Sequence, residues 1–259
     1  MIKVAALFTA GTNCDEETIH AFQLAGAKAE RVHLNLLKKK KHILKDYHIL
    51  VIPGGFTYGD YISAGKILAN ELQFILKDSV SEFIEQGKLI IGICNGFQVL
   101  VKAGILPGFS KYFTKQTVTL DVNDSNRFEC RWVYLKANEQ SPCIFTKGID
   151  ILPVPVAHAE GKFVVGSKKT LAKIKNQNQV VFTYTNDKGK KAGYPFNPNG
   201  SVEDIAGICD ATGRIFGLMP HPERASSIYQ HPNWSREKIK EAVGLKIFVN
   251  AVNYAKANL

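Results

Sequence analysis

The sequence lacks a long run of apolar residues. Stretches such as Ile49–Ile52 fall far short of the roughly 20 apolar residues that a membrane-spanning helix needs. The apolar segment at residues 1–8 is too short for a signal peptide, and no small-residue cleavage site follows it. We therefore expect no membrane association and a cytoplasmic protein.

Cysteine is scarce as well, with five residues at positions 14, 94, 130, 143 and 209. The number is odd, the spacings are wide, and no Cys-x-x-Cys occurs, which argues against a disulfide framework and against a zinc site. No His and Cys spacing typical of metal ligands is found either. We expect no metal in this chain, and an unpaired set of this kind leaves room for a reactive cysteine.

The sequence also has no nucleotide-binding fingerprint. A Gly-x-Gly-x-x-Gly string is missing. Residues Gly161–Lys168 have the glycine spacing of a P-loop, but Ser167 precedes Lys168, so the required Gly-Lys-Ser/Thr order fails. We therefore expect this chain to hold no cofactor of its own.

Acidic residues are fewer than basic ones, 23 against 33, which gives a net charge of +10. The excess is confined to residues 28–48 and 162–191, which together hold 15 of the basic and three of the acidic residues. Neither the lysine run at 38–41 nor the loop at 186–191 is interleaved with aromatic residues that could stack on bases. We therefore expect no nucleic-acid partner, and we interpret these segments as solvated loops or a docking surface.

Alternating strand and helix patterns fill the first part of the chain. The apolar runs at 4–8, 47–52 and 89–94 predict buried strands, and the periodicity at 15–25 and 67–84 predicts helices. Later strand-like runs lie at 117–122, 128–135, 154–157 and 180–184, followed by a hairpin at 205–219. A final helix is predicted at about 235–257.

This order of elements predicts an α/β fold: a doubly wound, flavodoxin-like, mostly parallel central sheet with antiparallel additions. No linker-like segment separates the two halves, so we expect one domain over residues 1–259, with the later strands extending the same sheet. In such folds, ligands bind at the carboxyl ends of the strands.

The sharpest local signal is Gly92–Gly96, which follows a predicted central strand and leads into a helix. It has the layout of a nucleophile elbow with Cys94 in place of serine, and the two glycines give the tight turn its room. A helix N-terminus favours the thiolate form of such a cysteine. The alternative interpretation is a buried cysteine beside helix-packing glycines.

A thiolate that attacks an amide needs a base and a group that orients the base. Two pairs fit, His221 with Glu223 and His158 with Glu160, and spacing alone does not separate them. The rigid Pro220-His221-Pro222 context favours the later pair modestly. An oxyanion hole is expected from the backbone N–H of Asn95 and from the glycine turn at Pro53–Gly55.

With these motifs assembled, the chain resembles the class I glutamine amidotransferases, and among them the glutaminase subunits of phosphoribosylformylglycinamidine synthase. Seven strings of the sequence carry the resemblance: Gly11–Asp15, Pro53–Tyr61, Gly92–Gln98, Asn126–Glu129, His158–Gly161, Asn197–Ser201 and Met219–Arg224. The second, fourth and sixth of these strings are specific to the purine-pathway members.

The resemblance implies a glutaminase in which Cys94 forms a glutamyl thioester and His221, oriented by Glu223, acts as acid and base. The resemblance thereby selects the pair of His221 and Glu223. His158 is left without a role, and we place it near a partner interface. Gly55 and Asn95 would form the oxyanion hole. The residues expected to bind substrate are Gln98, Arg127 and Phe128.

The resemblance also implies partners. Ammonia would pass to a large synthetase subunit that uses ATP and magnesium in purine biosynthesis, together with a small bridging subunit. A chain of 259 residues has no room for the synthetase domains. Such glutaminases are usually almost idle until a partner orders the oxyanion loop.

Three alternatives stay open at this point. The chain resembles, less closely, glutaminases of other class I pathways, such as histidine or GMP synthesis. It also has the fold expected of cysteine peptidases or chaperone-like proteins that need no His-Pro-Glu string. A basic nucleic-acid-binding protein is the third, and it would bind duplex DNA with a steep salt dependence.

Overall fold

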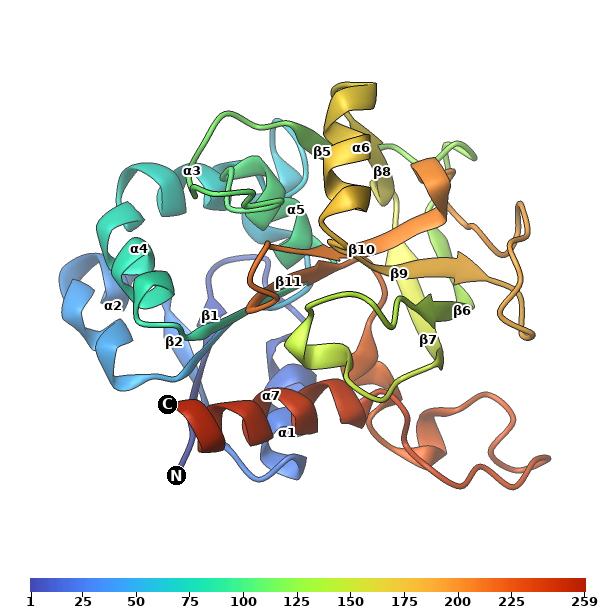
Figure 1. Ribbon diagram of the computed structural model, residues 1–259. Helices are drawn as coiled ribbons and strands as arrows, with labels where there is room; N and C mark the ends of the chain where they lie inside the picture. The colour runs from blue at the N-terminus through green and yellow to red at the C-terminus, as the bar shows by residue number, and fades with distance from the viewer.

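A nine-stranded sheet forms the centre of the computed structural model, which describes residues 1–259. Its strand order is β2-β1-β3-β4-β11-β10-β9-β6-β7, and helices lie on both of its faces (Figure 1). The expected α/β fold is confirmed. No helix has both the length and the apolar character needed to cross a membrane. The strands of this sheet are β1 (Lys3–Phe8), β2 (Lys28–His33), β3 (Ile49–Ile52), β4 (Leu89–Ile93), β6 (Glu129–Ala137), β7 (Ile151–His158), β9 (Val180–Thr185), β10 (Ile205–Cys209) and β11 (Ile215–Leu218).

Helices cover the sheet in two groups. In Figure 1, α3, α4 and α5 lie above the parallel strands, and α1 and α7 lie together below them. The single helical pattern at 67–84 is divided between α3 and α4, because Leu76 turns fully into the core at the junction. The helices are α1 (Asp15–Leu24), α2 (Leu34–Lys39), α3 (Lys66–Phe74), α4 (Lys77–Glu85), α5 (Asn95–Lys102), α6 (Lys168–Asn176) and α7 (Leu245–Asn258).

The half of the sheet formed by β2, β1, β3, β4 and β11 is parallel. Every residue of β3 and β4 is buried, as expected for strands covered on both faces. Parallel strands bring their carboxyl ends to one edge, so the segments that follow β3, β4 and β11 meet there.

The other half is antiparallel, in the order β11-β10-β9-β6-β7. The predicted hairpin at 205–219 is confirmed, because β10 pairs antiparallel with β11. β11 therefore belongs to both halves: it is parallel to β4 and antiparallel to β10.

One predicted addition to the sheet is wrong. The strand expected at 117–122 becomes β5 (Val118–Asp121), which pairs only with β8 (Lys162–Val165) in a separate two-stranded sheet. The buried side chains of this pair lie on one face, and Phe163 of β8 stacks on Phe97 of α5. The pair thus packs as an extra layer over α5 instead of extending the main sheet.

The predicted start of the final helix is also wrong. α7 begins at Leu245, not near Ser235, and residues 231–244 form turns. Gly244 explains the boundary, because its N–H donates to the carbonyl of Ala225. A Cβ on Gly244 would lie 2.3 Å from the carbonyl oxygen of Pro222, so the chain is docked there before the helix begins.

We expect Gly244→Ala to lower the free energy of unfolding by about 1–3 kcal/mol, because the added methyl group must displace the Pro222 backbone or the start of α7. Urea unfolding followed by circular dichroism measures the change. Gly193→Ala is the matched control, since a Cβ there meets no atom within 4 Å. An equal free energy of unfolding for the two variants would contradict the assigned contact.

Candidate active site

Cys94 stands in a strained turn between β4 and α5. Its φ of 51° and ψ of −106° lie outside the regions that most residues adopt, as in a nucleophile elbow. A Cβ on Gly92 would lie 2.5 Å from the carbonyl oxygen of Gly96, and a Cβ on Gly96 would lie 1.8 Å from that of Ile52. Only glycine fits at these two positions, so the sequence string and the turn require each other.

His221 and Glu223 follow β11, the parallel neighbour of β4. Nδ1 of His221 lies 2.6 Å from Oε1 of Glu223, and both side chains are buried. Burial lowers the pKa of His221, but the carboxylate of Glu223 and the nearby thiols of Cys94 and Cys14 outweigh it and raise the pKa well above its ordinary value. The bond to Glu223 occupies Nδ1 and leaves Nε2 without a partner in the protein.

The other His-x-Glu pair is arranged differently. Nδ1 of His158 contacts Asn123, whereas the carboxylate of Glu160 accepts from the N–H of Ala64 and lies 3.8 Å from Nζ of Lys102. Only the pair at 221 and 223 therefore has the histidine–carboxylate hydrogen bond that orients a base.

The glycine turn after β3 lies beside the elbow. Gly55 has a φ of +140°, and a Cβ there would lie 2.6 Å from the carbonyl oxygen of Gly11. The side chain of Asn95 fixes the next residues, because its Oδ1 accepts from the hydroxyl of Thr57 at 2.6 Å. The two expected oxyanion-hole residues, Gly55 and Asn95, are thus tied into one segment of structure.

Gly55 and Cys94 line the same small pocket of about 40 Å³. The rest of the lining mixes apolar and polar residues and includes two carboxylates. It consists of Phe56, Asp60, Ala64, Gln98, Ala157, His158, Ala159 and Glu160.

Of the three residues expected to bind substrate, only Gln98 lines this pocket. Its amide is held inside the protein: Nε2 donates to the carbonyl of Glu160, and Oε1 accepts from Asn95. Phe128 is half exposed, with its ring centroid 6.4 Å from that of Phe56. Arg127 is exposed and outside the lining.

Sequence reasoning missed two neighbours of His221. Cys14 is buried at the start of α1, and Nη2 of Arg224 donates to its Sγ at 3.1 Å. Burial raises the pKa of the Cys14 thiol, while the neighbouring imidazole of His221 acts in the opposite direction. The sequence did contain a signal for both residues, because Cys14 and Arg224 lie within two of the seven strings that match the amidotransferase family.

The ligand atoms of Cys14, His221 and Glu223 lie within 4.8 Å of one another, a donor set that suits zinc in type. The adjacent guanidinium of Arg224 opposes a cation at this point. A metal would also compete for the Glu223 oxygen that orients His221.

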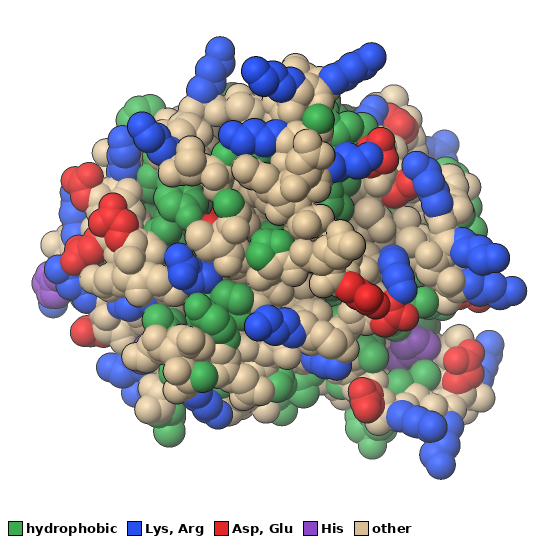
Figure 2. All heavy atoms as spheres, viewed as in Figure 1, with side chains coloured by type: hydrophobic (Ala, Val, Ile, Leu, Met, Phe, Trp, Pro, Cys, Tyr) green, Lys and Arg blue, Asp and Glu red, His purple; other side chains and the backbone are tan.

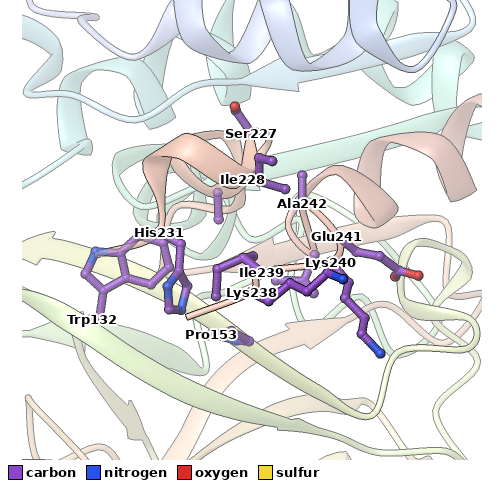
Figure 3. A pocket seen from close by; sticks show the side chains of 12 residues that line it. Trp132, Pro153, Ser227, Ile228, His231, Lys238, Ile239, Lys240, Glu241 and Ala242 are labelled. Atoms are coloured by element: carbon purple, nitrogen blue, oxygen red, sulfur yellow. The ribbon is translucent and has the colours of Figure 1, made fainter. Parts of the chain in front are cut away.

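A larger cavity, of about 380 Å³, is lined by a different set of residues (Figure 3). Trp132 and His231 stand at one end and Ile239 lies at its centre, with Lys238 and Lys240 on the turns before α7. None of the predicted site residues lines it.

The two basic segments do not meet at the pocket. One forms β2, α2 and the turn after it, and the other forms β8, α6 and β9, and Figure 1 places α2 and α6 far apart. On the face seen in Figure 2, basic side chains are scattered with acidic ones among them. Lys38 and Lys45 pair with Glu71 and Glu82.

Comparison with known proteins gives a family match over nearly the whole chain. The model of the CobB/CobQ-like glutamine amidotransferase domain matches residues 1–255. The PurQ subunit of phosphoribosylformylglycinamidine synthase from Dehalococcoides mccartyi is 53% identical, over 98% of both chains. The PurQ subunit from Pyrococcus furiosus is 38% identical over 99% of this chain and all of its own.

Solved structures agree. A chain in the structure of PurLQS from Thermotoga maritima is 33% identical, with a TM-score of 0.73 over 98% of both chains. A glutamine amidotransferase from Thermotoga maritima is only 17% identical, with a TM-score of 0.54 over 98% of this chain and 97% of its own, so it supports the fold alone.

We expect Glu223→Gln to reverse the pH dependence of stability that His221 contributes. In the wild type, the raised pKa gives stability that is complete below the unfolded pKa of 6.5 and is lost as pH rises through the folded value. Without the carboxylate, burial dominates, the folded pKa falls below 6.5, and stability rises with pH instead.

Urea unfolding between pH 5.5 and pH 8 measures the difference, which approaches about 1.4 kcal/mol per pH unit for one proton. Glu139→Gln, at an exposed position, is the control and keeps the wild-type slope. Identical slopes for all three proteins would show that Glu223 does not hold the His221 proton.

Proposed function

From the premise that this chain belongs to the PurQ subunits of phosphoribosylformylglycinamidine synthase, within the CobB/CobQ-like glutamine amidotransferase family, we propose how its site hydrolyses glutamine to glutamate and ammonia. One observation carries the mechanism. A strained Cys94 and the Gly55 turn line one pocket, and the buried His221–Glu223 pair follows the strand next to the elbow.

In the first half of the reaction, Nε2 of His221 takes the proton of the Cys94 thiol, and the sulfur attacks the carboxamide carbon of glutamine. Glu223 stabilises the resulting imidazolium through the bond at Nδ1. The oxyanion receives hydrogen bonds from the backbone N–H groups of Gly55 and Asn95. His221 then returns its proton to the nitrogen, the C–N bond breaks, and ammonia leaves a glutamyl thioester on Cys94.

In the second half, His221 removes a proton from water, which attacks the thioester carbonyl. The same oxyanion hole serves this step. The C–S bond breaks, the thiolate of Cys94 recovers a proton from His221, and glutamate is released. One base therefore serves both halves, which requires that Glu223 hold its ring in place throughout.

The ammonia goes to a partner. Because the similar Thermotoga maritima chain is part of PurLQS, we assign this chain a large synthetase subunit of the PurL kind and a small PurS-like subunit. ATP and magnesium are used at the synthetase in purine biosynthesis, in a complex located in the cytoplasm. Two apolar residues between the lining residues Asp60 and Ala64 support docking on this segment. Tyr61 and Ile62 are 73% and 86% exposed, and large apolar side chains gain free energy when a partner covers them.

We expect Cys94→Ala to lower glutamate release from glutamine by at least about a thousandfold in the assembled complex, because no other group near the pocket replaces the nucleophile. Synthesis with added ammonium salt continues, since that nitrogen bypasses the glutaminase. An enzymatic glutamate assay and circular dichroism measure activity and folding.

Cys130→Ala is the matched control, because this cysteine is exposed and does not line the pocket. Mass spectrometry after treatment with an electrophilic glutamine analogue is expected to find the label on Cys94. Retained activity in Cys94→Ala, or a label on one of the other four cysteines, would refute the mechanism.

A further inference from the structure

His158 is a buried histidine for which the mechanism has no use. It ends β7 and is only 2% exposed. The backbone of Gly161 packs closely against its ring, since a Cβ on Gly161 would lie 2.4 Å from its Nδ1. It lines the catalytic pocket together with Cys94 and Gly55, and its Nε2 is buried with no partner in the protein. A buried unpaired nitrogen costs free energy unless something else in the pocket pairs with it.

The hydrogen bonds of Asn123 determine which ring nitrogen of His158 carries the proton. Nδ2 of Asn123 donates to the carbonyls of Arg127 and His158 at 2.9 and 2.8 Å, and its Oδ1 accepts from the N–H of Gly161 at 3.0 Å. These three bonds fix the amide orientation. Nδ1 of His158, 3.2 Å from the same Oδ1, must therefore be the donor.

It follows that Nε2 of His158 is an unprotonated acceptor. Burial and the neighbouring His221 lower the pKa of His158 to about 3, so the ring stays neutral at physiological pH. The site thus has two buried histidines in opposite states, His158 in the pocket lining and His221 on the segment that follows β11. His221 gives and takes protons, whereas His158 offers a lone pair and has no proton to give at Nε2.

We propose that Nε2 of His158 accepts a hydrogen bond from the carboxamide N–H₂ group of bound glutamine and from the ammonia that forms from it. The inference rests on the glutaminase function proposed above. The α-ammonium group of glutamine is the weaker candidate donor, since Asp60 and Glu160 line the same pocket and carboxylates suit a cation better than a neutral imidazole does.

In the reaction, this hydrogen bond would orient the leaving nitrogen. When the carbon becomes tetrahedral, the nitrogen lone pair must face the proton on Nε2 of His221. A hydrogen bond from one N–H to His158 turns the lone pair that way. The proton still comes from His221, the C–N electron pair stays on nitrogen, and no proton moves at His158. Because Nε2 carries no proton, it also cannot convert the product ammonia to ammonium.

The test compares two leaving groups in the complete complex with the synthetase. His158→Phe keeps a ring but removes the acceptor. We expect it to lower kcat/KM for L-glutamine about tenfold to a hundredfold. The γ-methyl ester of L-glutamate has no N–H on its leaving group, so its cleavage is expected to change by less than about threefold on the same reasoning. His158→Gln, whose amide oxygen can accept, retains more glutamine activity than His158→Phe.

His20→Phe, at an exposed position on α1, is the matched control and keeps wild-type values on both substrates. An equal loss on the amide and the ester, or no loss on either, would overturn the proposal. ¹⁵N spectra of the imidazole groups in the wild type test the tautomer independently of any variant, and a protonated Nε2 on His158 would overturn it as well. If wild-type protein releases no glutamate at all, the proposed function fails instead.

Discussion

The parallel pairing of β4 with β11 is the constraint on which the site depends. Ile93 stands opposite Leu218 in this pair, and the N–H of Cys94 donates to the carbonyl of Leu218 at 2.8 Å. The segments after the two strands therefore leave the sheet side by side, although they lie far apart in the sequence. β3 adds the Gly55 turn on the other side of β4. Three neighbouring strands thus deliver the proposed nucleophile, base and oxyanion donor to one edge.

Burial lowers the pKa of both histidines at this edge, and their neighbours then shift the two pKa values in opposite directions. Around His221, the carboxylate of Glu223 outweighs the desolvation of the ring, so the charged form is favoured. Around His158, Asn123 offers only a neutral amide, and the charge on His221 adds to the desolvation. Two groups of one residue type are thereby separated into a proton carrier and a fixed acceptor, and environment alone makes the distinction.

The sequence patterns that succeeded were local. Apolar runs predicted β3 and β4, and the Gly92–Gly96 string predicted the elbow, because each is determined by neighbouring residues. The start of α7 failed because it depends on the contact of Gly244 with Pro222, which no periodicity records. Spacing alone left the two His-x-Glu pairs open for the same reason, since the partner of His158 is Asn123, a residue 35 positions away.

The remaining constraint is room. The pocket of about 40 Å³ is narrow, and the segment that follows Gly55 supplies Phe56, Asp60 and Ala64 to its lining. Movement of the segment after Gly55 would relieve backbone strain, because Tyr58, Asp60 and Ile62 all have positive φ angles. Each such angle costs roughly 1–3 kcal/mol. Ile62 is also almost fully exposed. A partner that covers this side chain would gain free energy from the apolar contact, and relaxation of the strained backbone would add to it. Under the proposed function, substrate entry and partner docking would act on the same few residues, which would link glutamine hydrolysis to the presence of an ammonia acceptor.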